Sequence, residues 1–303
     1  MLQSLFIRFQ VDDHCNKMGT LLGHVLPGSF FILFSLWWIV SISQRYFRSK
    51  FDPHFGKYKN TATFPSRRWS NIPVEAYFKL LAAVAGTIGE IITGFKWVDG
   101  SWQFANLIPN GHHIMMFSFF GFNAVADLVI FYKVLYLPKD TDYVSASIAV
   151  AVEGQLFANH LHGRDPLDVK LHSCLVVLII LCAISSLAEM VGNRDDVRYG
   201  LIRSCCYLWQ GTWFLQVGII LYPHDIFPIW DHQSMETRMI IDLIFLGHFW
   251  FSILVVFLIG IFVHHLVKSN HHKLNTQSNG SYECHKLIYS QDMDVDATCV
   301  ENA

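Results

Sequence analysis

Residues 169–191 read VKLHSCLVVLIILCAISSLAEMV, an apolar run whose two charged side chains, Lys170 and Glu189, lie near its ends. A helix needs about 20 mostly apolar residues to cross the hydrocarbon core of a bilayer, and this run is long enough. Further segments of the same kind bring the predicted spans to 21–43, 76–96, 112–136, 143–162, 169–191, 201–222 and 238–267. Only helices and closed barrels satisfy the backbone in lipid, and these runs are too long for barrel strands. We therefore expect an all-α, multi-pass membrane bundle of seven transmembrane helices.

The composition agrees with lipid as the main solvent. Of the 303 residues, 52% are hydrophobic and 15% are charged, whereas soluble domains average about 25% charged residues. The net charge of -2 gives no reason to expect nucleic acid as a partner. The partner we expect is the lipid bilayer, and the oligomeric state is left open.

The distribution of lysine and arginine predicts the orientation, because these residues are enriched in short cytoplasmic loops. They gather in the loop after the first span and in later loops on the same side. These residues are Arg45, Arg48, Lys50, Lys57, Lys59, Arg67, Arg68, Lys139, Arg194, Arg198, Lys268 and Lys273. Opposite loops carry Arg164 and a few flanking basic residues. The N-terminus is therefore predicted to be lumenal or extracellular, and the C-terminus cytosolic.

Three segments follow from this topology. Residues 1–17 form an N-terminal extension that lacks the long apolar stretch of a signal peptide. Residues 18–268 form the seven-helix transmembrane domain. Residues 269–303 are polar and end in an acidic, aromatic-poor stretch, so we expect a disordered cytosolic tail.

Several ionisable residues fall inside the predicted spans, where they are costly and usually persist for a functional reason. Glu153 lies about 15 Å into its span, close to the midplane. His160 follows two helical turns later on the same face, and His172 lies four residues after Asp168. Most of these groups are predicted at mid-to-outer depth, and Asp127 and Glu189 towards the cytosolic side.

Imidazole and carboxylate ligands at similar depth suit Zn²⁺ and related divalent ions. The hypothesis is a metal held by some members of one set: His112, His113, Glu153, His160, His172 and His248. A second set would form the supporting polar network: His24, Glu90, Asp127, Asp168 and Gln210. Glu153 is the candidate catalytic general base. The same groups could instead form a proton relay or a purely structural hydrogen-bonded core.

The tail contains a candidate sorting signal. Glu283, Leu287 and Ile288 match an acidic dileucine pattern, which indicates recognition by clathrin adaptors if the tail is cytosolic.

Several short motifs, in the same order, carry a resemblance to a known family. They are GHVLPGSFF at 23–31, GHH at 111–113, NHLHGRD at 159–165, WQGTWFLQVG at 209–218 and GHFW at 247–250. In these motifs the chain resembles the transmembrane protein 45 family, which includes the transmembrane epididymal proteins. The resemblance extends from Met18 to about Lys268 and implies a seven-helix protein of the endosome, lysosome or Golgi apparatus, with the plasma membrane as an alternative. It implies no settled biochemical activity, although some members are associated with trafficking and innate antiviral defence.

Three functions remain open on the sequence. The first is a metal-dependent intramembrane hydrolase that acts on a lipid-like substrate, by analogy of architecture alone. The second is a proton-coupled transporter, against which we find no internal repeat or paired broken helices. The third is a trafficking or innate-defence scaffold whose polar core only fixes helix packing.

Overall fold

The structure is a computed structural model that describes residues 20–52, 54–64, 71–105, 107–159, 161, 163–223 and 229–298. For residues 98, 109 and 273–298 it describes the backbone alone. The helices in these ranges are α2 (Leu21–Phe51), α3 (Val74–Gly94), α4 (Leu107–Tyr132), α5 (Thr141–Asn159), α6 (Pro166–Val191), α7 (Val197–Leu221) and α8 (Met235–Thr298). Each contains most of one predicted segment, so apolar run length located the helices.

The chain is a multi-pass helical membrane bundle. Among the described residues, five stretches of helix are long and apolar enough to cross a bilayer: Leu21–Phe51, Val74–Gly94, Asn110–Tyr132, Pro166–Val191 and Met235–His272. The other two helices, α5 and α7, carry buried polar side chains such as Glu153, Arg203 and Gln210, which lower their hydropathy. These side chains point into the bundle rather than towards lipid.

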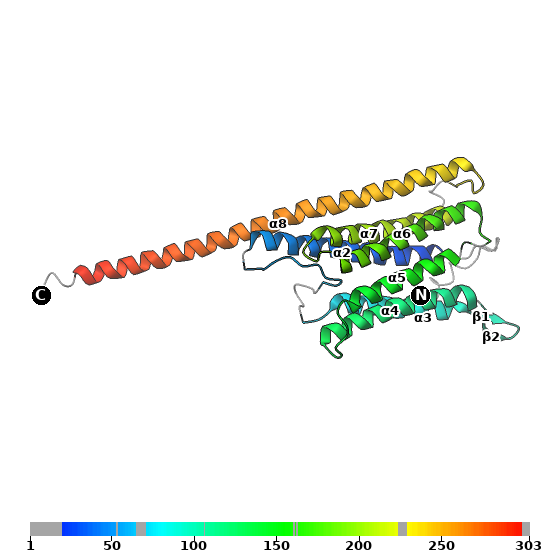
Figure 1. Ribbon diagram of the computed structural model, residues 1–303, viewed down its shortest axis with the longest axis horizontal. Coiled ribbons are helices and arrows are strands. Elements are labelled where there is room, and N and C mark those ends of the chain that lie inside the picture. Colours follow the sequence, from blue (N-terminus) through cyan, green and yellow to red (C-terminus); the bar gives the residue numbers. More distant parts are fainter. Residues whose placement is uncertain are drawn as a thin grey trace, which may run out of the picture.

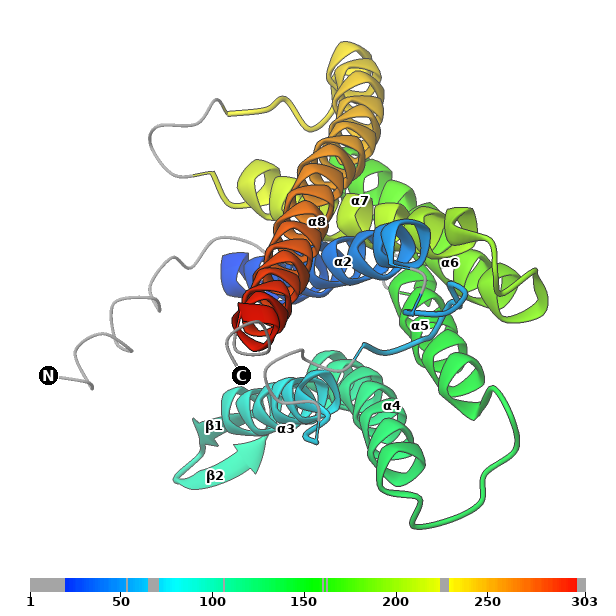
Figure 2. The same cartoon turned by 90° about the vertical axis from the view of Figure 1, so that its left-hand side faces the viewer.

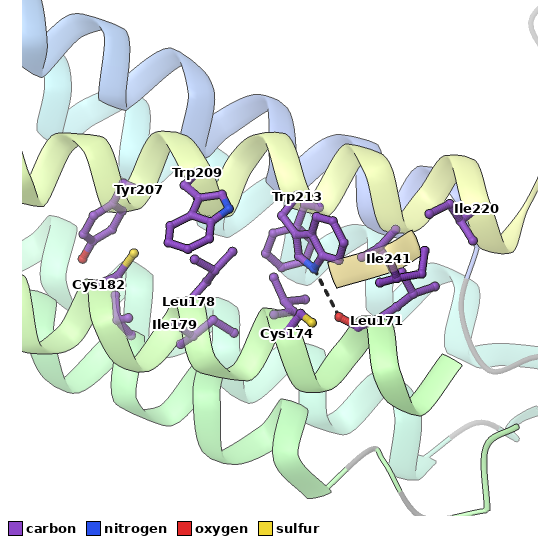
Figure 3. Close-up of a cluster of buried hydrophobic side chains, with 14 of the residues drawn as sticks. Leu171, Cys174, Leu178, Ile179, Cys182, Tyr207, Trp209, Trp213, Ile220 and Ile241 are labelled. Carbon is purple, nitrogen blue, oxygen red and sulfur yellow. Dashed lines mark hydrogen bonds between the residues drawn. The ribbon is translucent and has the colours of Figure 1, made fainter. Parts of the chain in front are cut away.

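The helices are arranged as two groups that meet around an interior space. One group contains α2, α6 and α7, with α8 packed along the outside against α2 and α7. In the other group α3 packs on α4 and α4 on α5, and α5 joins the two groups by packing on α6 (Figures 1 and 2). The apolar core lies mainly between α6 and α7, where Trp213 also donates a hydrogen bond from Nε1 to the Leu171 carbonyl at 3.2 Å (Figure 3).

Glycines bring α2 and α7 into backbone contact. A Cβ added at Gly28 of α2 would lie 2.9 Å from the Gly211 carbonyl oxygen, and one added at Gly211 would lie 2.8 Å from the Ile32 nitrogen. Small residues commonly allow such close approach between membrane helices. Gly86 of α3 serves the same purpose against α4, because a Cβ there would lie 2.5 Å from the Phe117 ring.

A two-stranded hairpin joins α3 to α4 and was not predicted. Strand β1 (Phe95–Val98) pairs antiparallel with β2 (Ser101–Phe104). The two turn residues, Asp99 and Gly100, have φ values of 50° and 79°, the left-handed conformations that favour Asp-Gly in a two-residue hairpin. The predicted span 76–96 therefore ends at Gly94, and residues 95 and 96 belong to the hairpin.

The C-terminal segment is helical as far as the structure describes it. Residues 269–298, predicted to be disordered, continue α8 as helix to Thr298 and extend away from the other helices (Figure 1). No proline interrupts this stretch, so local backbone hydrogen bonds can continue the helix. A polar helix without a packing partner is only marginally stable in water, and the predicted disorder of the tail in solution stays a prediction.

Candidate functional site

A cavity of about 110 Å³ lies inside the bundle, and α2 to α7 all contribute to its wall. One part of the wall is aromatic, with Phe30 and Phe31 from α2 and Phe117 and Phe120 from α4. One end of the cavity, near the C-terminal half of α2, is polar. Because neighbouring helices run in alternating directions, this end is lined by the N-terminal parts of α3, α5 and α7. The side chains there are Trp38, Lys79, Asn123, Asp127, Asp142, Tyr143 and Arg203. The cavity is therefore amphipathic along its length.

Lys79 lies at this polar end between two carboxylates. Its Nζ is 3.2 Å from Glu75 Oε1 and 3.1 Å from Asp127 Oδ2. Glu75 also accepts hydrogen bonds from the indole nitrogens of Trp38 at 2.9 Å and Trp37 at 3.2 Å. Asp127 was predicted to support a metal-binding cluster, but the contact it makes here is with Lys79.

A second buried ion pair joins α6 and α7 at the same end of the bundle. Arg203 donates to Glu189, and the Tyr143 hydroxyl donates to Glu189 at 3.0 Å. The Arg203 guanidinium also lies 4.3 Å from the Trp38 ring centroid. In the loop beside this pair, burial raises the pKa of the Tyr58 phenol above its ordinary value. These contacts hold α2, α5, α6 and α7 together.

Glu153 lines the cavity further from this polar end and is 1% exposed. Its Oε1 accepts a hydrogen bond from Gln210 Nε2 at 3.0 Å. Among the described residues its Oε2 has no hydrogen-bond partner, and the same holds for Asp127 Oδ1. Two carboxyl oxygens that line the cavity therefore lack a donor.

Two histidines meet at the opposite end of the bundle, which we predict to face the lumen. His24 Nε2 and His172 Nε2 are 3.5 Å apart, and both residues are buried. His172 Nδ1 is 2.6 Å from Asp168 Oδ1, and Asp168 accepts two hydrogen bonds from Arg164 at 2.9 and 3.0 Å.

Five of the six residues predicted to share a metal lie in the described part of the chain, and these five do not form a common site there. His113 pairs with Glu90 at 3.0 Å between α3 and α4, whereas His248 contacts Gln216 at 3.3 Å between α7 and α8. His112 is on α4, Glu153 pairs with Gln210, and His160 lies outside the described residues. In the part of the chain that the structure describes, no group of three or more His, Cys, Asp or Glu residues could hold a metal ion. Residues predicted at a similar depth in the membrane therefore need not lie close to one another.

Comparison with known proteins finds sequence similarity to one family and to two relatives. A model described as "Family of unknown function (DUF716)" matches residues 139–263, from α5 into α8. The chain is 20% identical over 247 residues to Transmembrane epididymal protein 1 of Rattus norvegicus, with 76% of each chain covered. It is 19% identical over 249 residues to Transmembrane epididymal protein 1A of Mus musculus, again with 76% of each covered.

The chain is similar in sequence to the transmembrane epididymal proteins. The resemblance inferred from the short motifs is thereby confirmed, and so is the multi-pass membrane character. The matched family has no assigned function, and the names of the relatives give neither a substrate nor a metal. The residues of the cavity and of the histidine pair therefore have to be interpreted from their own chemistry.

At the polar end of the cavity, sequence reasoning identified Asp127 but missed Glu75, Lys79 and Arg203. Glu75 lies one residue before the predicted start of its span, and Lys79 and Arg203 were not singled out. The spacing of Glu75 and Lys79 was a usable signal, because residues four apart lie on the same helix face and can pair. Arg203 had no such signal, since Glu189 and Tyr143 are far from it in sequence.

Proposed function

We propose that the chain is a seven-span endomembrane protein that binds a small amphipathic molecule in the cavity between its helices. The cavity supports this proposal because it combines an aromatic wall with two carboxyl oxygens that lack donors. α5 and α7 are included as spans because they pack against α6, and α7 also packs along α2, in the same bundle as the five apolar stretches. Pockets for small molecules commonly combine a mostly apolar lining with a few placed polar groups.

The size of the cavity limits the ligand. A dry cavity of roughly 150 Å³ accommodates benzene, so about 110 Å³ accepts a small ring or one end of a chain. A whole phospholipid would not fit without movement of the wall. We therefore expect a slender molecule, or only part of a larger lipid, inside the bundle.

The polar atoms define the head group. Asp127 Oδ1 and Glu153 Oε2 are acceptors that lack donors, and burying an acceptor without a donor costs about 1–3 kcal/mol. A ligand that carries hydroxyl or ammonium donors would satisfy them, whereas a fatty acid would add a further carboxylate. The expected ligand is an apolar chain with an amino or hydroxyl head.

Access from the bilayer would pass between α2 and α3. Phe30 and Phe34 of α2 meet Phe78 of α3 with ring centroids 5.7 and 5.5 Å apart. α2 and α3 meet through these side chains and the Trp–Glu75 hydrogen bonds, without the close backbone packing that joins α2 to α7. Aromatic side chains can change rotamer, so this seam is the natural entrance for an apolar chain.

The test is direct binding of radiolabelled sphingosine, a long-chain amino alcohol, to the full chain in detergent micelles. Saturable binding is expected, with competition by unlabelled sphingosine and not by palmitic acid. Ala83→Phe should abolish it, because Ala83 is buried and lines the cavity. Ala85→Phe is the matched control, since Ala85 lies on the same helix and is exposed to lipid.

Glu153→Gln separates recognition of the head group from filling of the cavity. It replaces the carboxyl group with an amide of nearly the same shape, and we expect at least tenfold weaker binding. Absence of saturable binding, or equal loss in Ala83→Phe and Ala85→Phe, would contradict the proposal.

We further propose that the N-terminus faces the lumen or exterior. The protein would reside in endosomes, lysosomes or the Golgi apparatus. Clathrin adaptors would recognise Glu283, Leu287 and Ile288 in its tail. The lysine and arginine distribution and the dileucine pattern support this, although the side chains of residues 273–298 lie outside the described part. Replacing Leu287 and Ile288 with alanine should move the protein to the cell surface in imaging. Unchanged distribution would contradict adaptor recognition.

A further inference from the structure

His24 and His172 form a buried pair whose contacts fix where their protons lie. His24 Nδ1 is 2.9 Å from the Thr20 carbonyl oxygen, and a carbonyl can only accept a hydrogen bond. His24 Nδ1 therefore carries the proton and donates. In a neutral imidazole the other nitrogen, Nε2, then has a free lone pair.

The same reasoning applies to His172. Its Nδ1 is 2.6 Å from Asp168 Oδ1 and 3.1 Å from the Asp168 carbonyl oxygen. Arg164 donates to both carboxyl oxygens of Asp168, as expected for an ionised carboxylate. His172 Nδ1 therefore also donates, and its Nε2 also has a free lone pair.

The two Nε2 lone pairs face each other, and neither Nε2 atom of the neutral imidazoles has a proton to donate. The Nε2 atoms are 3.5 Å apart, beyond the roughly 2.7–3.2 Å typical of N–H···O hydrogen bonds. Two imidazole nitrogens bound to one tetrahedral Zn²⁺ at about 2.0–2.1 Å would be separated by about 3.3–3.4 Å. The observed distance is close to that value.

The surroundings have the form of a metal site. Metal-binding histidines almost always donate their other ring N–H to a carboxylate or a backbone carbonyl, and here one imidazole does each. The Phe157 ring stacks on the His172 ring at a centroid distance of 6.0 Å. The centroids of the Tyr222 and His24 rings are 5.7 Å apart. These aromatic rings restrict the positions that the imidazoles can adopt.

From this geometry we propose that His24 and His172 bind one divalent cation of the zinc class through their Nε2 atoms. The remaining coordination positions are filled by water. Asp168 and the Thr20 carbonyl orient the two ligands, and Arg164 holds Asp168 in its ionised form. Neither histidine lines the cavity, so the metal site does not depend on the amphipathic ligand proposed above.

The test measures zinc directly. The full chain in detergent is stripped with a chelator, dialysed against micromolar Zn²⁺ and analysed by elemental mass spectrometry. About one zinc per chain is expected for the wild type, and at least tenfold weaker binding for His24→Gln and His172→Gln. Groups that accept a hydrogen bond from a metal-binding histidine typically contribute about 10–100-fold to metal affinity, so Asp168→Asn should weaken binding within that range. His113→Gln and His248→Gln are matched controls, since each removes a membrane histidine elsewhere, and both should keep the zinc.

A second measurement requires no variant and therefore does not depend on the folding of a mutant. Co²⁺ bound to the wild-type chain should give the strong visible absorption of a tetrahedral site, and stoichiometric Zn²⁺ should abolish it. No zinc in the dialysed wild type, or no such Co²⁺ spectrum, would overturn the proposal and leave a proton shared between the imidazoles. Equal loss of zinc from the control variants would also overturn it.

Discussion

Arg203 and Glu189 carry opposite charges inside the bundle, and their side chains are 5% and 0% exposed. Removing one member of a buried ion pair leaves the other charge without compensation, which costs about 3–5 kcal/mol. Glu189→Leu and Arg203→Met should each lower the thermal stability of the purified chain strongly. The double variant should be more stable than the sum of the two single effects predicts, because it leaves no unpaired charge. Strictly additive losses would show that the two residues are not coupled.

The exposed pair Asp196 and Arg198 provides the matched control. Arg198 holds the pKa of Asp196 below its ordinary value through direct hydrogen bonds, but both groups lie in water at the start of α7. Exposed ion pairs contribute little to stability. Asp196→Asn should therefore leave the melting temperature close to that of the wild type.

At the residue scale, sequence could locate polar groups by depth but not by direction around each helix. Depth follows from counting residues, so Glu153, His172 and His248 were all expected at mid-to-outer depth. Whether they meet depends on how each helix is rotated and on which helices are neighbours. Glu153 faces Gln210, whereas His248 faces Gln216 on the other side of α7. Neither helix rotation nor helix order can be read from hydropathy.

Whole elements were far more predictable. The helices of the described residues lie at the predicted segments. A helix that crosses a bilayer must be apolar over about 20 residues, and such a run is visible in the sequence. The hairpin, which was not predicted, depends on local turn geometry and not on the length of an apolar run. The hairpin depends on the turn at Asp99 and Gly100, and those two residues between aromatic strands were an available signal.

The contact between α2 and α7 leads to a prediction for one element. In Gly211→Ala the new Cβ would lie 2.8 Å from the Ile32 backbone nitrogen, and the backbone cannot rotate away as a side chain can. The helices must separate, so we expect a loss of about 1–3 kcal/mol of stability. Thermal unfolding in detergent measures it.

Gly89→Ala in α3 is the control, because a Cβ there meets nothing within 4 Å. Alanine is favoured over glycine in a helix by roughly 1 kcal/mol, so this variant should be as stable as the wild type or slightly more stable. An equal loss in both variants would mean that the α2–α7 contact is not the cause.

At the scale of the whole molecule, the proposed orientation determines which groups face which compartment. The hairpin and the histidine pair would face the lumen or exterior, whereas the basic loop after α2 and the end of α8 would face the cytosol. A glycosylation acceptor, Asn-Gly-Ser, inserted at the exposed turn after Asp99 should therefore be modified in cells. The reason is that the transferase acts only on the lumenal side, and the turn is accessible there.

The chain supplies its own control for this experiment. Asn279, Gly280 and Ser281 already match the acceptor pattern, and in the proposed orientation they stay in the cytosol without a glycan. Digestion with an endoglycosidase should therefore shift the mobility of the hairpin variant and leave that of the wild type unchanged. The reverse result would invert the topology, and it would place the histidine pair, with its proposed metal, at the cytosolic face. In one orientation the metal would come from the lumen or exterior, and in the other it would come from the cytosol. The orientation therefore has to be measured before any activity is sought at that site.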